Sequence, residues 1–429
     1  MEASSHPFIG GERKKTLPER EGCNHRLRAL LTKSMAPPTL DFVAYNTRMD
    51  GMTNSQRSGL HPRPVFNQLP KYAAGKPPAP VEGLTQYKLS SNENPFGPVA
   101  SVAQILAEFD TVHRYPDPLS TALRTALGEH LEVDPEDIVT GAGSLGALTQ
   151  ILTTFAGTHA DGVQDEVIYA WRSFEAYPIC VGLAGAKSVQ VPNLPNGAHD
   201  LDAMAAAVTD QTRVILICTP NNPTGPAVTE SQVRNFLAKV PSDVLVVIDE
   251  AYFEFCAASE IPEGQEPPVN GLDVYPDYPN VAILRTFSKA QGLAGLRVGY
   301  SITHPEVTAH LRVGATPFAV SALAEKAAVA SLDYNDEVME RVEHLVAERE
   351  KVVAGLQELG YWVPETRANF VWLPLGEHSA AFAALAEANA LSVRAFAGEG
   401  VLVSIGEDEA NARLLKIVAE FEERTDKPL

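Results

Sequence analysis

The sequence predicts an α/β protein whose large domain is a mainly parallel sheet with helices on both faces, followed by a smaller α+β domain. Short apolar runs alternate with stretches of helical spacing through the middle of the chain, which is typical of a parallel sheet. Near Pro317 this alternation ends, and a long helical pattern followed by strand-like segments begins. A chain of 429 residues also exceeds what one small core needs.

The individual elements are predicted from periodicity. Residues 167–169, 214–217 and 244–248 are uninterrupted apolar runs and are expected to be buried strands. A helix is expected after residue 144, because its apolar residues recur at three- and four-residue intervals. They are Leu145, Leu148, Ile151, Leu152 and Phe155.

The smaller domain is expected over residues 318–429. Residues 334–359 have the apolar spacing of one long helix, and residues 369–375 and 401–405 are strand-like. A helix around 380–390 and another at the C-terminus complete an α+β pattern.

The N-terminal part of the chain differs from the rest. Residues 1–62 lack apolar periodicity and are expected to form a disordered extension, although translation from Met35, Met49 or Met52 is an open alternative. Residues 63–100 are rich in Pro, Gly and Asn and should be mostly extended, packing with the small domain. This leaves 101–317 for the large domain.

Composition narrows the function classes. A formal net charge of -20 argues against a surface for nucleic acid or anionic membrane. The four cysteines are far apart with no CxxC pair, so neither a disulfide framework nor a metal site is expected, and a reducing cytoplasm fits best. No apolar run reaches the roughly 18 residues of a membrane-spanning helix.

Four motifs follow predicted strands, at the edge where open α/β sheets bind ligands. Residues 140–144 (TGAGS) lead into a helix and can bind an anion, although such turns often serve only to reverse the chain. Residues 219–225 (TPNNPTG) have the composition of a turn. Residues 249–252 (DEAY) begin with Asp249, which is either a helix cap or the partner of a buried cation.

The fourth motif is residues 285–289 (RTFSK), which follow a predicted strand at 281–284. Most lysines are solvated surface charges, but Lys289 is surrounded in the sequence by small and apolar residues. Burial and nearby cations would lower the pKa of its amine and make it a usable nucleophile.

Together these motifs resemble the fold-type I pyridoxal-phosphate aminotransferases, in the branch that holds histidinol-phosphate and bacterial aromatic amino acid aminotransferases. The resemblance covers about residues 63–425 and implies a seven-stranded-type sheet. Its carriers are residues 89–98 (LSSNENPFGP), 115–118 (YPDP), the NNPTG segment, the DEAY segment and Ser288-Lys289.

The resemblance implies a role for each matching position. Lys289 would form the Schiff base and move the substrate proton, and Asp249 would hold the pyridine nitrogen protonated. Asn222 and Tyr252 would bind the phenolic oxygen, and Phe174 would stack on the ring. The phosphate would be bound by Ser144, Leu145, Thr286, Ser288 and Arg297. Tyr115 would reach the phosphate of a neighbouring subunit, which implies a homodimer with the active site at its interface.

The sequence departs from the family pattern at the substrate. Asn94, Arg394 and Leu402 fall at substrate-binding positions, but the family has an Arg where this chain has Leu402. A leucine offers no donor to a carboxylate, which removes a contact worth roughly 1.5–3 kcal/mol. Arg394 can compensate, or it can be a surface or structural residue. The chain is then either a transaminase with relocated or weakened carboxylate recognition, or a cofactor-binding protein with weak or altered activity.

Residues 170–177 (AWRSFEAY) and 396–400 (FAGEG) favour the aromatic aminotransferases. The predicted reaction is transamination of an aromatic L-amino acid with 2-oxoglutarate, giving an aromatic 2-oxo acid and L-glutamate. Histidinol-phosphate aminotransferase is the alternative, although a substrate phosphate would need more cations than Arg394. A non-enzymatic cofactor-binding regulator is the competing class.

Overall fold

The computed structural model describes residues 62–425, and the described residues from Pro64 onward form one compact unit. The predictions of an N-terminal extension and of alternative starts lie outside the described residues. The predicted boundaries at 100/101 and 317/318 stay predictions. In the described part of the chain, no helix is both long and apolar enough to cross a membrane.

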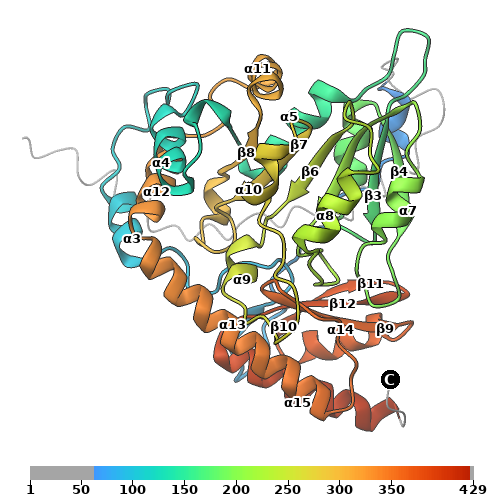
Figure 1. Cartoon of the computed structure of the whole chain (residues 1–429). Helices are drawn as coiled ribbons and strands as arrows, with labels where there is room; N and C mark the ends of the chain where they lie inside the picture. The colour runs from blue at the N-terminus through green and yellow to red at the C-terminus, as the bar shows by residue number, and fades with distance from the viewer. Residues whose placement is uncertain (1–61, 426–429) are drawn as a thin grey trace, which may run out of the picture. The chain divides into compact units, whose positions relative to one another are not determined.

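A seven-stranded sheet forms the centre of the unit (Figure 1). Its strand order is β2-β8-β7-β6-β5-β3-β4, and β8 alone runs antiparallel to both of its neighbours. The strands are β2 (Ile138–Gly141), β3 (Glu166–Trp171), β4 (Lys187–Pro192), β5 (Thr212–Cys218), β6 (Leu245–Asp249), β7 (Val281–Thr286) and β8 (Gly299–Thr303).

Successive residues of the central strands enter different cores, because side chains alternate between the two faces of a sheet. Val214 and Leu216 pack with one buried cluster, while Ile215 and Ile217 pack with another. Both faces are therefore buried, which explains why these strands have uninterrupted apolar sequences.

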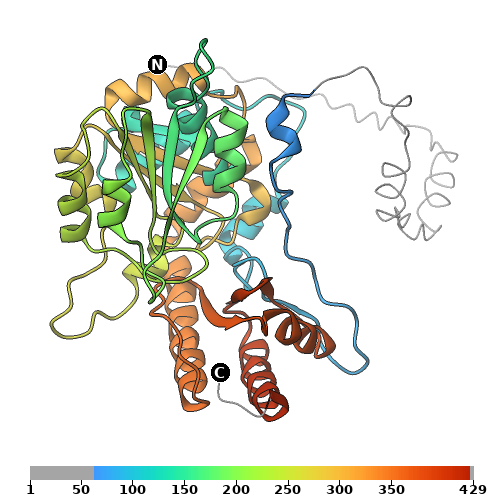
Figure 2. The ribbon, with the colours of Figure 1, turned by 90° about the vertical axis from the view of Figure 1, so that its right-hand side faces the viewer.

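Helices cover both faces, and Figure 2 shows them on either side of the strands. One face packs against α5 (Gly143–Phe155), α6 (Tyr177–Ala184) and α11 (Pro305–Gly314). The other packs against α7 (Leu201–Ala206), α8 (Glu230–Leu237) and α10 (Gly271–Val274). The short helix α9 (Phe253–Ala257) follows β6.

A second group of elements lies beyond the carboxyl ends of the parallel strands (Figure 1). It contains the antiparallel sheet β11-β12-β9, formed by β9 (Phe370–Gly376), β11 (Arg394–Phe396) and β12 (Glu399–Ser404). The helices α14 (Ser379–Ala388) and α15 (Asp408–Thr425) pack on each other beside it. Two-residue strands β1 (Tyr87–Lys88) and β10 (Leu391–Ser392) pair in parallel and join the N-terminal segment to this group.

Four further helices complete the described part of the chain. Helix α12 (Ala322–Asp333) packs against α3 (Ala100–Ala107) and α4 (Thr121–Leu131). The long helix α13 (Asn335–Glu358), orange in Figure 1, then runs to α15 and β9. Single 3-10 turns are η2 (Pro64–Asn67), η3 (Pro135–Asp137), η4 (Tyr275–Asp277) and η5 (Ala294–Leu296).

The predicted fold class is confirmed. The apolar runs became β3, β5 and β6, the helical pattern after residue 144 became α5, and the long helix predicted over 334–359 is α13. The strand predicted at 281–284 is β7, and β2 precedes the motif at 140–144, as that motif implied. Strands β4 and β8 were not predicted, because polar residues interrupt their apolar sequences.

Candidate active site

A cavity of about 440 Å³ lies at the carboxyl ends of β3, β5, β6 and β7, between the large sheet and the β11–β12 hairpin. Loops at this edge converge because the parallel strands all end there. Most of the predicted site residues line it. They are Ser144, Leu145, Phe174, Asn222, Asp249, Tyr252, Thr286, Ser288, Lys289, Arg297, Arg394 and Leu402.

Lys289 follows β7 and reaches the cavity with its amine. Its Nζ donates to the carbonyl oxygen of Ser91 at 3.2 Å and lies 5.6 Å from the centroid of the Tyr252 ring. The pKa of Lys289 is lowered to about 8, mainly by burial; Glu93 opposes this shift, and Arg297 contributes to it. The amine is therefore partly neutral near physiological pH, as a nucleophile or proton acceptor must be.

Asp249 is the last residue of β6 and is buried at the cavity floor. Its Oδ2 accepts a hydrogen bond from the Tyr177 hydroxyl at 2.7 Å, while its Oδ1 is buried without a protein partner. Burial raises the pKa of Asp249 to about 6, although the Tyr177 hydrogen bond opposes that shift. A buried carboxylate oxygen without a partner fits a ligand that brings a cationic N–H group.

The Tyr252 hydroxyl receives two hydrogen bonds from side-chain amides. Asn222 donates from Nδ2 at 2.9 Å and Asn92 donates from Nδ2 at 3.0 Å. Because both contacts use the oxygen as acceptor, the hydroxyl hydrogen is left to donate to a ligand oxygen.

Asn92 is a site residue that the sequence did not identify. It has a φ of 53°, and its side-chain oxygen accepts a hydrogen bond from the Ser404 hydroxyl at 3.0 Å. The residue lies in the LSSNENPFGP segment, but that segment contains two asparagines, and their spacing does not show which one faces the cavity.

An anion cradle forms where the N-terminus of α5 meets β7 and η5. Gly143 has a φ of 74°, and a Cβ atom there would lie 2.4 Å from Nη2 of Arg297. The Thr286 hydroxyl donates to Oγ of Ser288 at 3.0 Å, and Arg297 donates from Nη1 to the same oxygen at 3.3 Å. A helix N-terminus, two hydroxyls and a guanidinium together suit a phosphate group.

The opposite end of the cavity is formed by aromatic rings and one ion pair. Arg394 donates to Oε2 of Glu175 from Nη2 at 2.7 Å and from Nε at 3.2 Å. Arg394 and Leu402 are direct partners across β11 and β12, and Leu402 is only 3% exposed. Tyr72, Glu175 and Phe396 also line this end and were not predicted as site residues. Glu175 and Phe396 lie in the segments 170–177 and 396–400 that favour the aromatic aminotransferases, but the sequence does not show which side chains of those segments face a cavity.

Two predicted residues lie elsewhere. The Asn94 amide donates to the carbonyl oxygen of Ala290 at 3.0 Å, and the residue lines a neighbouring cavity of about 300 Å³. Tyr115 is 85% exposed and stacks on Phe318, with ring centroids 4.9 Å apart. Neither residue is among those that line the main cavity.

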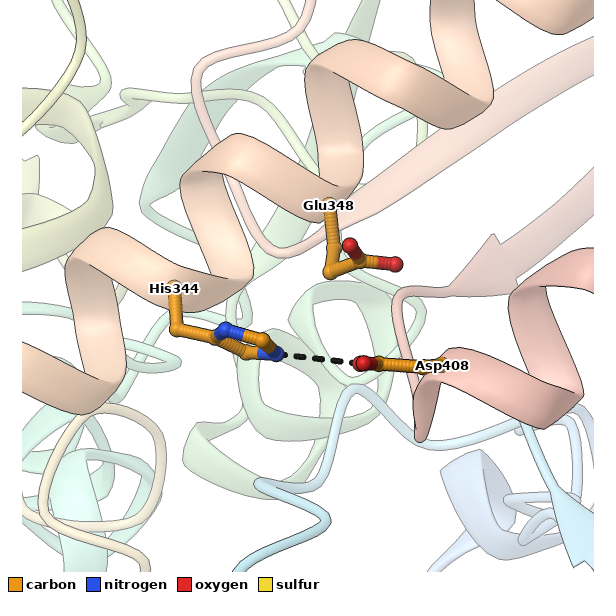
Figure 3. Close-up of side chains that lie close together, drawn as sticks. All are labelled: His344, Glu348 and Asp408. Atoms are coloured by element: carbon orange, nitrogen blue, oxygen red, sulfur yellow. Dashed lines mark hydrogen bonds and ion pairs between the residues drawn. The ribbon is translucent and has the colours of Figure 1, made fainter.

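A separate cluster of His344, Glu348 and Asp408 joins α13 to α15 (Figure 3). His344 Nε2 lies 3.0 Å from Oδ1 of Asp408. Glu348 accepts hydrogen bonds from Lys351 at 2.5 Å and Asn411 at 3.2 Å. Each side chain therefore already has a protein partner, and the cluster is accounted for as a contact between two helices.

The sequence is similar to a known protein family and to several named relatives. Residues 85–416 match the family model described as aminotransferase class I and II. An aromatic amino acid aminotransferase from Streptomyces avermitilis is 52% identical over 360 residues, covering 84% of this chain and 97% of the relative. One of the same name from Thermobifida fusca is 48% identical over 371 residues, covering 86% and 99%.

Solved structures support the fold. A histidinol-phosphate aminotransferase from Sinorhizobium meliloti, in complex with pyridoxal-5'-phosphate, has a TM-score of 0.70 at 24% identity, covering 88% of this chain and 100% of its own. A putative histidinol-phosphate aminotransferase from Erwinia carotovora atroseptica has a TM-score of 0.71 at 22% identity, covering 79% and 97%.

Proposed function

The chain belongs to the class I and II aminotransferases, and on this premise we propose that it acts on aromatic L-amino acids with pyridoxal phosphate as cofactor. The amino group would pass to 2-oxoglutarate, giving an aromatic 2-oxo acid and L-glutamate. Support for the substrate class comes from the names of relatives that are 42–52% identical and are covered over most of their length.

One observation carries the proposal. A single cavity combines a lysine of lowered pKa, a buried carboxylate oxygen without a partner and a cradle for an anion. These three features fit the aldehyde, the pyridine nitrogen and the phosphate of pyridoxal phosphate. The cofactor would be held by Lys289, Asp249, Asn222, Tyr252 and Phe174, with Ser144, Leu145, Thr286, Ser288 and Arg297 at the phosphate.

When bound, the cofactor supplies an electron sink for the charge left at the substrate Cα. The protein supplies position and proton transfer. Asp249 would keep a proton on the ring nitrogen; burial raises the pKa of this carboxyl, and a cationic N–H group beside Oδ1 would favour its charged form. The Nζ atom of Lys289 would take the proton from the substrate Cα and return it at the cofactor carbon C4′, because its amine is partly neutral near pH 8.

Substrate selection would depend on the opposite end of the cavity. Phe174, Phe396 and Leu402 offer apolar surface to an aromatic side chain, and Arg394 offers a guanidinium to the α-carboxylate. Arg394 would thus replace the contact that Leu402 cannot make. Asn94 remains a proposed substrate residue only through the neighbouring cavity that it lines.

Histidinol phosphate is the less well supported substrate. Among the described residues that line the cavity, the cationic side chains are those of Lys289, Arg297 and Arg394. The first two are assigned to the cofactor, so a substrate phosphate would depend on Arg394 alone.

The proposal includes a homodimer in the cytoplasm. Tyr115 and Phe318 form an exposed aromatic pair, and in a dimer Tyr115 would reach the phosphate in the neighbouring subunit. An exposed aromatic stack of this kind is better accommodated at a subunit interface than in water.

Steady-state assays of the purified holoprotein with 2-oxoglutarate test the proposed function. Phenylalanine and tyrosine should give glutamate with a kcat/KM at least about tenfold above that for histidinol phosphate. A preference for histidinol phosphate would replace the proposed substrate class. Cofactor binding without turnover of any amino acid would favour a binding protein.

A further inference from the structure

Two ion pairs join the loop after β3 to the β11–β12 hairpin. The loop supplies the cation in one pair and the carboxylate in the other. Arg172 of the loop binds both carboxylate oxygens of Glu399, with Nε 2.6 Å from Oε2. Arg394 of the hairpin binds Glu175 of the loop, with Nη2 2.7 Å from Oε2. Each element therefore contributes one cation and one carboxylate to the contact.

The two pairs differ in their relation to the cavity. Glu175 and Arg394 line it, whereas Arg172 and Glu399 are not among the described residues that do. The Glu175–Arg394 pair is also incompletely buried, with side-chain exposures of 31% and 18%. An ion pair at a partly solvated cavity wall can exchange its partner at a modest cost in free energy.

Arg394 has no second cation beside it on the hairpin. Its direct partner across the strands is Leu402, and its Cζ lies 5.6 Å from the centroid of the Phe396 ring. A carboxylate that enters this end of the cavity would therefore find the Nε and Nη2 donors of Arg394, which form one edge of the guanidinium, already bound by Glu175.

We propose that Glu175 is an internal competitor for Arg394, which must release this carboxylate before it binds the α-carboxylate of a substrate. The inference rests on the proposed function in taking the substrate to be an amino acid. Only the molecules in which Arg394 is free can then bind a carboxylate. The measured affinity is therefore the intrinsic affinity multiplied by the fraction of such molecules. When the product leaves, Glu175 returns to Arg394 and restores the free state.

A purely structural role for Glu175 predicts a different pattern. If the pair served only to hold the loop against the hairpin, its loss would weaken all ligands of the cavity to a similar extent. Competition predicts a selective gain for ligands that carry a carboxylate. Glu399→Gln is the matched control, because it breaks the other ion pair between the same two elements without touching Arg394.

The test uses the holoprotein with 3-phenylpropionate and 3-phenylpropanamide, which share an aromatic ring and lack an amine. Calorimetry should show Glu175→Gln binding the propionate roughly fivefold more tightly than wild type, with unchanged affinity for the propanamide. Glu399→Gln should leave the ratio of the two affinities unchanged. Arg394→Gln should remove the preference for the propionate. With phenylalanine, Glu175→Gln should lower KM by a similar factor.

An unchanged or weaker affinity of Glu175→Gln for the propionate would overturn the proposal, as would an equal gain in Glu399→Gln. Neither probe can be transaminated, so this result is independent of turnover. Tighter propionate binding without phenylalanine turnover would reject the proposed function and support the competition.

Discussion

At the scale of single residues, burial shifts the pKa values of both Lys289 and Asp249. Burial favours the uncharged form of each, lowering the pKa of the amine to about 8 and raising that of the carboxyl to about 6. The resemblance implied both roles, but the unpartnered Oδ1 of Asp249 became visible only in the structure. Each shift leads to a prediction about pH.

The rate at which the cofactor-free protein captures pyridoxal phosphate should rise with pH around a midpoint near 8. The neutral amine of Lys289 is the reactive form, and its fraction grows as pH passes the lowered pKa of about 8. Stopped-flow absorbance across pH 6.5–10 gives the profile. A midpoint near the roughly 10.4 of an ordinary lysine would contradict the burial of this amine.

Asp249→Asn should stabilise the cofactor-free protein at pH 7 while impairing the enzyme. The folded state keeps the proton of this carboxyl up to about pH 6, so the contribution of Asp249 to stability should fall as pH rises from about 4 to about 6. The variant should lack this one contribution, so its gain in unfolding free energy over wild type should grow across this range to at most roughly 3 kcal/mol at pH 7. Denaturant titrations at several pH values measure the unfolding free energy of both proteins. If it changes equally with pH in the two proteins, the pKa of Asp249 is not raised in the folded state.

The same substitution should slow transamination by roughly 100-fold or more, because an amide does not hold a proton on the pyridine nitrogen. Single-turnover rates with phenylalanine measure the loss. Full activity in Asp249→Asn would show that the carboxylate has no part in the chemistry.

At the scale of elements, the start of α5 depends on a close approach between backbone and side chain. Gly143→Ala places a methyl group 2.4 Å from Nη2 of Arg297 at a φ of 74°, so the cradle should open. We expect cofactor affinity to fall roughly tenfold or more, as measured by equilibrium titration. Gly295→Ala is the control, because its Cβ would have no neighbour within 4 Å. An equal loss of cofactor affinity in both variants would contradict the proposal that the start of α5 and Arg297 bind the phosphate.

A second prediction at the scale of elements concerns Leu402 in strand β12. Leu402→Arg adds a second guanidinium beside Arg394 and should lower KM for phenylalanine about tenfold, since one charge-assisted hydrogen bond is worth roughly 1.5–3 kcal/mol. The unfolding free energy should fall, because Leu402 is 3% exposed. Leu402→Met serves as the volume-matched control. No improvement in KM would mean that Leu402 does not limit carboxylate binding.

At the scale of the whole molecule, an active site shared between subunits makes a prediction by complementation. Tyr115→Ala and Lys289→Ala variants should each be impaired, and mixed dimers should contain one intact site. Refolding an equal mixture should restore about a quarter of wild-type activity per subunit. Sedimentation velocity checks that the mixture is dimeric. If mixing the two variants restores no activity, Tyr115 does not contribute to the site of the neighbouring subunit.

The sequence predicted those parts of the molecule that local patterns encode. Uninterrupted apolar runs predicted β3, β5 and β6 because both faces of the sheet are buried. Motifs at strand ends predicted the cavity wall around Lys289 and Asp249.

Side chains brought together across the chain could not be predicted in this way. The Glu175–Arg394 pair spans 219 residues, and the Asn92–Tyr252 hydrogen bond spans 160. The polar strand β4 has no apolar run to reveal it.

The most direct test of the account is a single-turnover reaction of the holoprotein with phenylalanine, followed by absorbance and by product analysis. We expect loss of the cofactor absorbance of the Lys289-bound form, with one equivalent of phenylpyruvate released per active site. The Lys289→Ala protein should release none. An unchanged spectrum without phenylpyruvate in the wild-type protein would contradict the proposal that this chain is an aromatic aminotransferase.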